Sequence, residues 1–346
     1  MTTIDDVADH AGVSTTTVSR VLNGTGNVNQ QLAERVRASV VALQYRPSRA
    51  ARALRANRAR TVGLLISDIE NPFFTALVRG VEDVVQQNGY SLILCNSDED
   101  PRKERQYIEV LCAEQVAGAI IVPTHEHQPG LRLFRDQHIA VVTVDRRVKD
   151  RDTDAVLVDN VRGAREAVTH LIDNGYRRIG LITGPMNTTT GIERRDGYRQ
   201  ALQAAGIPHD PSLERYGSFK EESGHRLTQE LLQLAHPVDS LFAANNVMTL
   251  GALEALDAQG LHMPDDIGVV GFDDMPWAAL GSVSLTTVAQ PVYELGNTAA
   301  LRLFQRLLNP NAFSRQEIVL APWLCPRGSS RRRVAPGEIP DPTTDR

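Results

Sequence analysis

Short apolar runs alternate with amphipathic stretches over most of this 346-residue chain, and this alternation constrains its fold more than any other feature. The runs are rich in Val, Ile and Leu, which is typical of strands buried on both faces of a parallel sheet. The intervening stretches, such as 73–88 and 247–259, have helical periodicity and indicate βαβ units. Nine runs have this pattern, at residues 61–67, 91–97, 117–123, 139–145, 155–159, 178–184, 213–219, 240–246 and 267–273.

The nine runs predict an α/β body, residues 61–328, made of two similar halves in which helices flank parallel sheets. We expect the chain to cross between the halves at Asp159-Asn160 and at Gln290-Pro291. In open α/β sheets, ligands bind beyond the carboxyl ends of the strands. A two-lobed body should therefore bind its ligand in the cleft where those strand ends converge.

The first 45 residues have a different pattern, that of three short helices. Thr3 and Asp6 have the spacing of an N-terminal capping box. Ser14 is placed to cap a second helix running to about Asn23, and Asn29 to cap a third. Two helices joined by a tight glycine turn, with a polar outer face on the second, predict a helix-turn-helix that binds DNA. Any helical hairpin shows this periodicity, so the pattern alone leaves a plain helical domain open.

Residues 46–60, RPSRAARALRANRAR, contain six arginines and no acidic residue. The alanines favour a helix, but arginines every three residues wrap around the helix axis and leave no apolar stripe to dock on a core. A helix this short and unsupported is marginal in water. Two interpretations remain: a solvated basic linker, or a hinge that folds when DNA phosphates neutralise its arginines. In the second, Leu54 is free to insert between base pairs.

Charge separates the head of the chain from its body. Residues 1–60 contain nine arginines and four acidic residues, a net charge of +5, so the net charge of −5 leaves −10 for residues 61–346. A basic head on an acidic body indicates that the head meets nucleic acid. The N-terminus is acidic and polar, no apolar run approaches the about 18 residues of a membrane span, and the three cysteines are odd in number. We therefore expect a cytoplasmic protein with no membrane partner.

Two segments are similar to motifs of one family. TIDDVADHAGVSTTTVSRVLN (residues 3–23) resembles the DNA-binding signature of the lactose/galactose repressor (LacI/GalR) family. YRPSRAARALR (residues 45–55) resembles the hinge helix of that family, with Leu54 at the position of its intercalating leucine. The resemblance continues to about residue 328. It implies a helix-turn-helix domain at 1–45, a hinge helix at 46–60, and a core at 61–328 like that of periplasmic binding proteins, in a homodimer that binds palindromic operator DNA.

The resemblance also implies which residues contact double-stranded DNA. Thr15, Thr16 and Arg20 would read base edges in the major groove, where short hydroxyl side chains permit close approach and an arginine binds guanine with two hydrogen bonds. The hinge would lie in the minor groove. The predicted DNA-binding set is Ser14, Thr15, Thr16, Thr17, Ser19, Arg20, Asn23, Arg49, Arg52, Leu54 and Arg55.

Polar and aromatic side chains stand where the predicted strands end. Carboxylates, amides and guanidinium groups hold sugar hydroxyls through hydrogen bonds, and aromatic faces stack on the C–H surface of a sugar ring. Each residue has an ordinary alternative, because Asp and Asn form turns and Phe is common in cores. The predicted effector-binding set is Asn71, Phe73, Phe74, Asp145, Arg146, Arg194, Phe219, Asn245, Asp273 and Gln290.

Together these residues resemble the binding set shared by the cores of this family and periplasmic pentose- and hexose-binding proteins, with the ribose-binding type the most similar. One position departs from it: Asn246 stands where many relatives carry aspartate, which removes a charge near the cleft and leaves the sugar's identity open. A nucleoside, a purine or a sugar phosphate is the alternative effector, since aromatic stacking suits bases as well as sugars.

The sequence gives little support to an enzyme or a metal site. His125 and His127 form an HxH pair, but no Cys, Asp or Glu follows at metal-ligand spacing. Asp273 and Asp274 are adjacent, with no evident acid/base partner, and the chain contains neither a P-loop nor a G-x-S-x-G motif. We expect no catalytic residues, no metal and no cofactor.

The last 18 residues, 329–346, contain three prolines and few apolar residues, which predicts a disordered tail. They contain no leucine heptad, which argues against a tetramerising coil. The sequence therefore predicts a cytoplasmic, homodimeric DNA-binding regulator, a repressor of carbohydrate-utilisation genes, controlled by a monosaccharide such as ribose bound between the core lobes. An exported sugar-binding protein and a sugar-processing enzyme are the alternative classes.

Overall fold

The computed structural model of the chain describes residues 2–23, 28–45, 60–149, 153–280, 284–309 and 314–332. The chain forms two compact units, residues 1–59 and 60–346. Most of the predicted hinge, with Arg49, Arg52, Leu54 and Arg55, lies outside the described residues, as does the predicted tail beyond Arg332.

The first unit contains three helices, α1 (Ile4–Ala11), α2 (Thr15–Asn23) and α3 (Gln30–Ala42). The predicted capping box begins α1: Thr3 Oγ1 accepts from the amide of Asp6 at 3.3 Å, and the Asp6 carboxylate accepts from the amide of Thr3 at 2.7 Å. Gly12 ends α1 with a φ of 61°, a left-handed conformation that glycine adopts without a steric penalty. Small apolar side chains from all three helices fill the core, namely Val7, Ala8, Ala11, Val18 and Val36.

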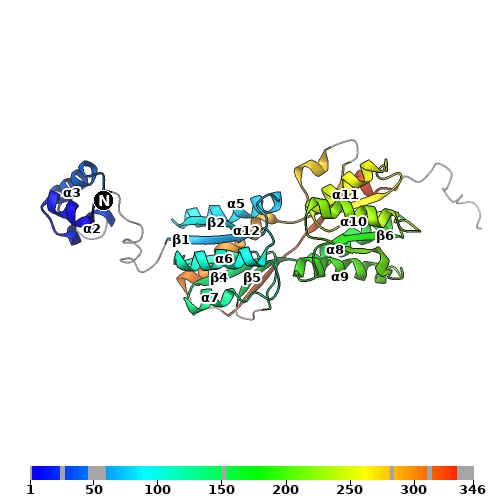
Figure 1. The fold of residues 1–346 in the computed structure, drawn as a ribbon, viewed down its shortest axis with the longest axis horizontal. Helices are drawn as coiled ribbons and strands as arrows, with labels where there is room; N and C mark the ends of the chain where they lie inside the picture. The colour runs from blue at the N-terminus through cyan, green and yellow to red at the C-terminus, as the bar shows by residue number, and fades with distance from the viewer. Residues whose placement is uncertain are drawn as a thin grey trace, which may run out of the picture. The chain divides into compact units, whose positions relative to one another are not determined.

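The second unit contains two lobes, each a six-stranded sheet covered by helices on both faces (Figure 1). The first sheet has the order β11-β5-β4-β3-β1-β2, and all its strands are parallel. Its strands are β1 (Thr61–Ile66), β2 (Ser91–Asn96), β3 (Gly118–Ile121), β4 (Ala140–Val144), β5 (Asp154–Val158) and β11 (Glu317–Leu320). Its covering helices are α5 (Pro72–Gln87) and α12 (Val292–Leu308) on one face, and α6 (Pro101–Ala113) and α7 (Leu131–Asp136) on the other.

The second lobe repeats this plan. Its sheet has the order β12-β10-β9-β8-β6-β7, in which β12 alone is antiparallel to its neighbour. The strands are β6 (Ile179–Thr183), β7 (Glu214–Tyr216), β8 (Ser240–Ala243), β9 (Gly268–Phe272), β10 (Thr286–Ala289) and β12 (Trp323–Cys325). The helices are α8 (Asn160–Asp173) and α9 (Thr189–Ala204) on one face, and α10 (Glu221–Leu232) and α11 (Asn246–Ala258) on the other, with short 3-10 turns at Pro211–Leu213, Pro276–Ala279 and Gly328–Ser330.

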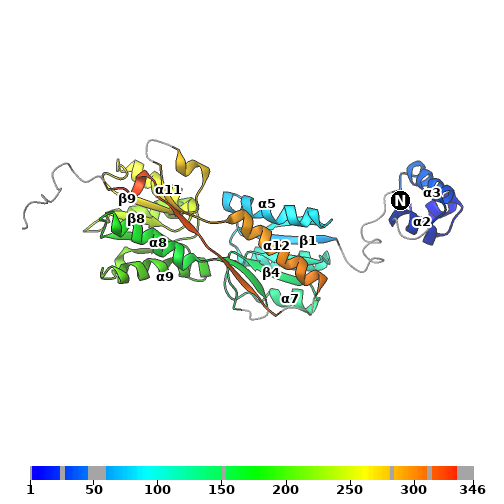
Figure 2. The ribbon, with the colours of Figure 1, turned by 180° about the vertical axis from the view of Figure 1, so that it is seen from behind.

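The α/β fold and all nine predicted strands are confirmed, but three further strands were missed. The chain crosses between lobes after β5 and after β10, as predicted, and a third time between β11 and β12 (Figure 2). β11 and β12 are only half-buried and lie in one apolar stretch, residues 318–325, which Pro322 interrupts, and β10 is a short segment with two threonines. The C-terminal segment therefore adds an edge strand to each lobe.

The predicted start of the tail at residue 329 is wrong. Ser329 and Ser330 are fully buried. Ser329 Oγ donates to the carbonyl of Val269 at 2.7 Å and accepts from the amide of Thr286 at 2.8 Å, which joins the chain end to the second sheet. Hydropathy scores serine as polar, so it does not predict burial of a serine whose hydroxyl group bonds to the backbone. In the part of the chain that the structure describes, no helix is long and apolar enough to cross a membrane.

Candidate functional site

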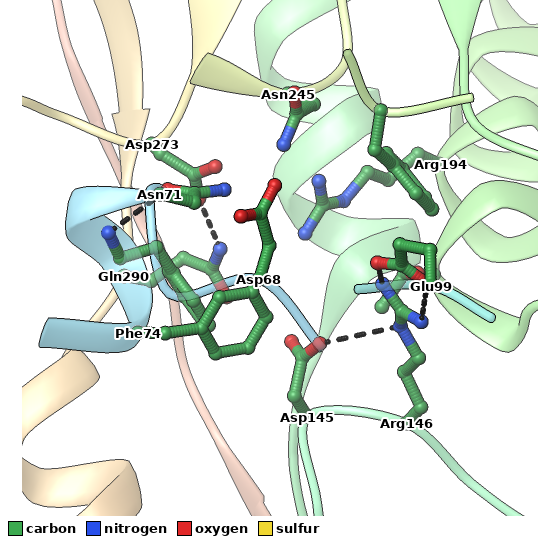
Figure 3. A pocket seen from close by; sticks show the side chains of 13 residues that line it. Asp68, Asn71, Phe74, Glu99, Asp145, Arg146, Arg194, Asn245, Asp273 and Gln290 are labelled. Atoms are coloured by element: carbon green, nitrogen blue, oxygen red, sulfur yellow. Dashed lines mark hydrogen bonds and ion pairs between the residues drawn. The ribbon is translucent and has the colours of Figure 1, made fainter. Parts of the chain in front are cut away.

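A cavity lies between the two lobes of the second unit, at the carboxyl ends of strands from both sheets (Figure 3). Its space, including the mouth that faces solvent, is about 380 Å³. All ten predicted effector-binding residues line it. The complete lining is Asp68, Asn71, Phe73, Phe74, Glu99, Asp145, Arg146, Thr190, Arg194, Phe219, Asn245, Asp273 and Gln290.

The same position in each lobe supplies an aspartate. Asp145 follows β4 and Asp273 follows β9, each the third strand in its sheet order. Both residues have left-handed backbone, with φ of 68° and 75°. Their amides donate to the neighbouring strand, to the carbonyls of Val156 at 3.0 Å and Val288 at 2.8 Å. Left-handed backbone at a non-glycine residue is costly and clusters at ligand sites, and here it turns both carboxylates toward the cavity (Figure 3).

The two carboxylates differ in their hydrogen bonds. Asp273 accepts from Gln290 Nε2 and, at 3.3 Å, from the amide of Asn246. Among the described residues, the Asp145 carboxylate has one polar partner, Arg146 Nε at 3.6 Å, which is too long for a hydrogen bond. Asp145 is therefore a buried acceptor that a ligand hydroxyl would satisfy.

Burial raises the pKa of both carboxyl groups. The pKa of Asp145 rises to about 6, chiefly through desolvation, although Arg146 and Arg194 oppose the rise. Desolvation likewise raises the pKa of Asp273, opposed by Arg194 and by the hydrogen bond from Gln290. Two buried carboxylates that resist ionisation are typical of a site built to bind something.

The guanidinium of Arg146 is neutralised from within its own lobe. Glu99 accepts from both of its terminal nitrogens, at 2.7 and 2.6 Å, and the carbonyl of Pro123 accepts from one of them at 3.1 Å. Burial lowers the pKa of Arg146, but the charge and hydrogen bonds of Glu99 outweigh it and raise that pKa above its usual range. This pair is the closest ion pair drawn in the cavity wall of Figure 3.

Arg194, from the second lobe, is held by neutral groups instead. Its Nε donates to Asn160 Oδ1 at 2.9 Å, and its NH1 donates to the carbonyl of Ala244 at 2.6 Å. The guanidinium also lies over the ring of Phe272, 3.8 Å from the ring centroid. Burial lowers the pKa of Arg194, with Asp273 and Asp145 opposing the effect. Because these hydrogen-bond partners are uncharged, they leave the positive charge of Arg194 available to a ligand in the cavity.

Three polar atoms in the cavity wall are buried without a hydrogen-bond partner among the described residues. They are Arg146 Nε, a donor, Gln290 Oε1, an acceptor, and Thr190 Oγ1, which can be either. Buried polar atoms are nearly always paired in proteins, because an unpaired one costs free energy. The wall therefore favours a ligand with several groups that both donate and accept hydrogen bonds, as hydroxyl groups do.

Aromatic rings close the cavity from both lobes. Phe73 and Phe74, at the start of α5, pack edge to face with centroids 5.0 Å apart. Phe219 has a φ of 61° and covers Gly184 so closely that a Cβ there would lie 1.9 Å from its ring. Arg146 lies 5.1 Å from the centroid of the Phe219 ring, across the two lobes. These faces suit the apolar side of a ring-shaped ligand.

The asparagines at the cavity also cap helices, so they have a structural role in addition to the proposed role in ligand binding. Asn71 Oδ1 caps α5 by accepting from the amide of Phe73 at 2.9 Å, and Asn245 Oδ1 caps α11 by accepting from Met248 at 3.0 Å. Asn246, the position that departs from many relatives, donates from Nδ2 to Asn71 Oδ1 at 2.7 Å and so joins the lobes. An aspartate there would offer no such donor.

Three cavity residues were missed in the sequence. Asp68 comes soon after the end of β1 at Ile66, so the strand-end rule could have found it. Glu99 lies one residue further from the end of β2 at Asn96, in a turn where Asp98 and Glu99 both have left-handed backbone, with φ of 55° and 56°. Thr190 belongs to the first turn of α9, where no strand end marks it.

Polar bridges join the lobes beside the cavity. Lys220 Nζ, from the second lobe, lies 2.7 Å from Asp68 and 3.1 Å from Asp98 of the first. Arg147 of the first lobe pairs with Glu193 of the second. With the bond between the two asparagines, these contacts mean that the lobes are closed on each other in this structure.

In the first unit, α2 presents the predicted base-reading side chains. Thr16 and Arg20 are exposed, whereas Thr15 and Thr17 are half-buried. Ser14 Oγ accepts from the amide of Thr17 at 3.2 Å, so its hydroxyl also caps the helix. The other predicted positions on this helix are Ser19, part-buried, and Asn23, the last residue of α2.

The HxH pair does not form a metal site with its neighbours. His125 Nδ1 lies 2.9 Å from Thr124 Oγ1, beside the buried Glu104, and His127 is exposed. Throughout the described ranges, no group of three His, Cys, Asp or Glu residues is arranged to hold a metal ion.

A three-helix unit with a helix-turn-helix, and a two-lobed α/β unit with a ligand cavity, together define a ligand-responsive DNA-binding regulator. Family models bear this out: the model described as bacterial regulatory proteins, lacI family, matches residues 3–48. The model described as periplasmic binding proteins and sugar binding domain of LacI family matches residues 59–321. The chain belongs to the LacI family of bacterial transcriptional regulators, which are not enzymes.

Individual relatives are similar over nearly the whole chain. The ribose operon repressor of Escherichia coli (strain K12) is 37% identical over 333 residues, covering 95% of this chain and 100% of that protein. The HTH-type transcriptional repressor PurR of Klebsiella pneumoniae (strain 342) is 36% identical over 343 residues, covering 99% of both. Among solved structures, the lac repressor dimer bound to operator and the anti-inducer ONPF has a TM-score of 0.82 and 27% identity, covering 95% of this chain and 99% of that one.

Proposed function

We propose that this regulator is a cytoplasmic repressor of sugar-utilisation genes that binds a palindromic operator as a homodimer and is controlled by a monosaccharide, ribose or a close relative. The observation that carries the effector assignment is the cavity wall, in which carboxylates and guanidinium groups from both lobes surround three unpaired buried polar atoms. A sugar offers a hydroxyl on nearly every carbon, and each hydroxyl both donates and accepts a hydrogen bond.

The sugar would bridge the lobes. Asp145 and Arg146 would meet it from the first lobe, and Arg194, Asn245 and Asp273 from the second. The phenylalanine rings would cover its apolar faces. The similarity to the ribose operon repressor supports ribose as the first candidate.

A purine is the second candidate, because the chain is nearly as similar to a repressor named PurR. A flat base would use the phenylalanine faces, but it has fewer groups to satisfy acceptors on both lobes. The two candidates therefore differ in which side chains they need: a sugar depends on Asp145, whereas a stacked base depends more on Phe74 and Phe219.

Operator recognition would come from the first unit. We propose that Thr15, Thr16 and Arg20 of α2 contact base edges, and that the arginines and Leu54 of residues 46–60 contact the minor groove. Each good two-bond contact between an arginine and guanine discriminates by about 1–3 kcal/mol. Arg20→Ala should therefore weaken operator binding and relax the base preference at one position in each half-site. The similarity to the lac repressor dimer on its operator supports this arrangement.

A ligand-binding panel tests the effector assignment. The full-length protein is melted with D-ribose, other monosaccharides, purines and nucleosides, each at increasing concentration. A ligand at 100 times its Kd that binds only the folded state stabilises it by about 2.7 kcal/mol, which is a melting shift of several degrees. The proposal expects this shift with ribose or a close relative. A shift with purines and none with sugars would overturn the sugar assignment and leave the family assignment intact.

A further inference from the structure

Glu99 occupies an unusual place in the cavity wall. It lies in the turn after β2, next to Asp98, and both residues have left-handed backbone, with φ of 55° and 56°. Its amide donates to the carbonyl of Ser67 at 2.9 Å, which fixes the turn against the end of β1. Two consecutive strained residues persist only where the surrounding contacts hold them, and such strain gathers at ligand sites. The turn directs Asp98 to Lys220 and Glu99 to Arg146.

The pair that Glu99 forms uses the part of Arg146 that would bind an anion. A guanidinium binds a carboxylate or a phosphate through two parallel N–H groups. Both terminal nitrogens of Arg146 already donate to Glu99, at 2.7 and 2.6 Å, and the side chains are 5% and 18% exposed. The remaining N–H, on Nε, is buried without a hydrogen-bond partner and lies 3.6 Å from Asp145. Arg146 can therefore give one hydrogen bond to a neutral group, and its charge is already balanced.

Apart from Arg194, no other described residue that lines the cavity supplies a positive charge in place of that of Arg146, which Glu99 neutralises. Asp68 is paired with Lys220 from the opposite lobe. Asp145 lies 3.6 Å from Arg146 Nε, but the charge of Arg146 is already balanced by Glu99. Among the described residues that line the cavity, Arg194, whose hydrogen bonds go to neutral groups, is therefore the one cation that no carboxylate pairs with directly. The cavity is therefore biased toward negative charge, and an anionic ligand would meet repulsion at short range.

We propose that Glu99 determines specificity by making this pocket reject anionic sugars, so that the regulator senses a sugar in its neutral form and not after phosphorylation or oxidation to an acid. The inference rests on the proposed function, since it concerns the same pocket. It also decides against a sugar phosphate, which the sequence alone leaves open as the effector.

The test measures a ratio of dissociation constants by calorimetry at pH 8 and fixed salt, on the full-length protein. The neutral probe is D-ribose, and the anionic probes are D-ribose 5-phosphate and D-ribonate. Wild type should bind each anion at least tenfold more weakly than ribose. Glu99→Gln keeps a hydrogen-bond acceptor for Arg146 but removes the negative charge that balances the guanidinium. The Kd of each anion divided by the Kd of ribose should therefore fall by about tenfold or more.

Asp68→Asn is the matched control, because it removes one negative charge from the same wall and leaves the pair of Glu99 and Arg146 in place. Its ratio should move less than that of Glu99→Gln. An equal change of this Kd ratio in both variants, or no change in Glu99→Gln, would overturn the role of Glu99.

The wild-type protein is decisive even if Glu99→Gln does not fold, because binding of either anion within tenfold of ribose contradicts the proposal. Failure of wild type to bind ribose at all would instead overturn the proposed function, and this inference with it.

Discussion

The two lobes have the same strand order, yet they present opposite chemistry to the cavity between them. In the first lobe, the arginine is neutralised by Glu99 while Asp145 has no hydrogen-bond partner among the described residues. In the second, Asp273 is held by two donors, and Arg194 keeps its charge because its partners are neutral. A repeated fold thus supplies an open acceptor from one side and an open cation from the other.

This difference shows that symmetry of the backbone fixes where functional residues stand, whereas their neighbours fix what those residues do. Asp145 and Asp273 occupy equivalent positions with equivalent backbone. Their roles diverge through Gln290, which comes from the second crossover and has no counterpart bonded to Asp145. A ring bound between the lobes would meet a different set of partners on each side, which fixes its orientation.

The largest expected effect comes from breaking the ion pair of the first lobe. Arg146→Met leaves the half-buried Glu99 without a countercharge; breaking a fully buried pair costs about 3–5 kcal/mol, and the partial exposure of Glu99 places this loss toward the lower end. Arg194→Met removes no direct carboxylate partner, so it should lower the free energy of unfolding less. Urea unfolding of both variants without ligand measures the difference. Equal losses in the two variants would contradict the contrast between the arginines.

The next effect concerns the effector alone. Asp145→Ala removes the open acceptor, and losing a hydrogen bond to a charged group inside a closed site costs about 1.5–3 kcal/mol of binding. At 100 times the wild-type Kd, where ribose stabilises wild type by about 2.7 kcal/mol, the melting shift of the variant should fall by about half or more. Asp136→Ala, at the exposed end of α7 in the same lobe, is the control and should keep the shift. A full ribose shift in Asp145→Ala would exclude this carboxylate as a contact.

Effector affinity should depend on pH through the same residue. The pKa of Asp145 is about 6, and the ionised form is the one that accepts two hydroxyl groups. Affinity should therefore be constant above pH 7 and fall as pH drops through 6, approaching tenfold per pH unit below it. Calorimetry between pH 5 and 8 measures this, with Asp145→Asn as the reference, in which only the pH dependence due to Asp273 remains. A flat profile in wild type would show that ionised Asp145 does not bind the ligand.

The smallest effect comes from the bridge across the lobes. Lys220 is 38% exposed at its side chain, so its pairs with Asp68 and Asp98 contribute less than about 1 kcal/mol. Lys220→Met should weaken ribose binding a few-fold, because it removes contacts made only when the lobes are closed. Lys149→Met, which breaks a pair with Glu126 inside the first lobe, should leave affinity unchanged. Equal affinity in the two variants would mean that Lys220 does not stabilise closure.

Much of the cavity was predictable because parallel strands end at one edge. Residues such as Asp145, Asp273 and Asn245 directly follow apolar runs, so their convergence follows from the sheet itself. Glu99 was not predictable, since its approach to Arg146 depends on two left-handed residues in a turn. The pairing of Lys220 with Asp68 depends on the lobes being closed, which no local pattern reports.

The edges of the fold were harder to predict than its centre. β11 and β12 are half-buried strands from one apolar stretch, residues 318–325, and its division between two sheets depends on where the chain returns to strands already paired. Ser329 and Ser330 are buried through hydrogen bonds of their hydroxyl groups, which composition cannot distinguish from a polar tail. In both cases long-range pairing outweighs local preference.

The most direct test of the central claim measures operator binding with the cavity empty and filled. Fluorescence anisotropy, at one salt concentration because DNA affinity depends strongly on salt, follows a palindromic operator that the full-length protein selects from random DNA. Ribose should change the operator Kd of wild type by about fivefold or more, the usual size of such coupling. Asp145→Ala should bind the operator with wild-type affinity and need at least tenfold more ribose for the same response. An unchanged operator Kd in wild type saturated with ribose would contradict the account.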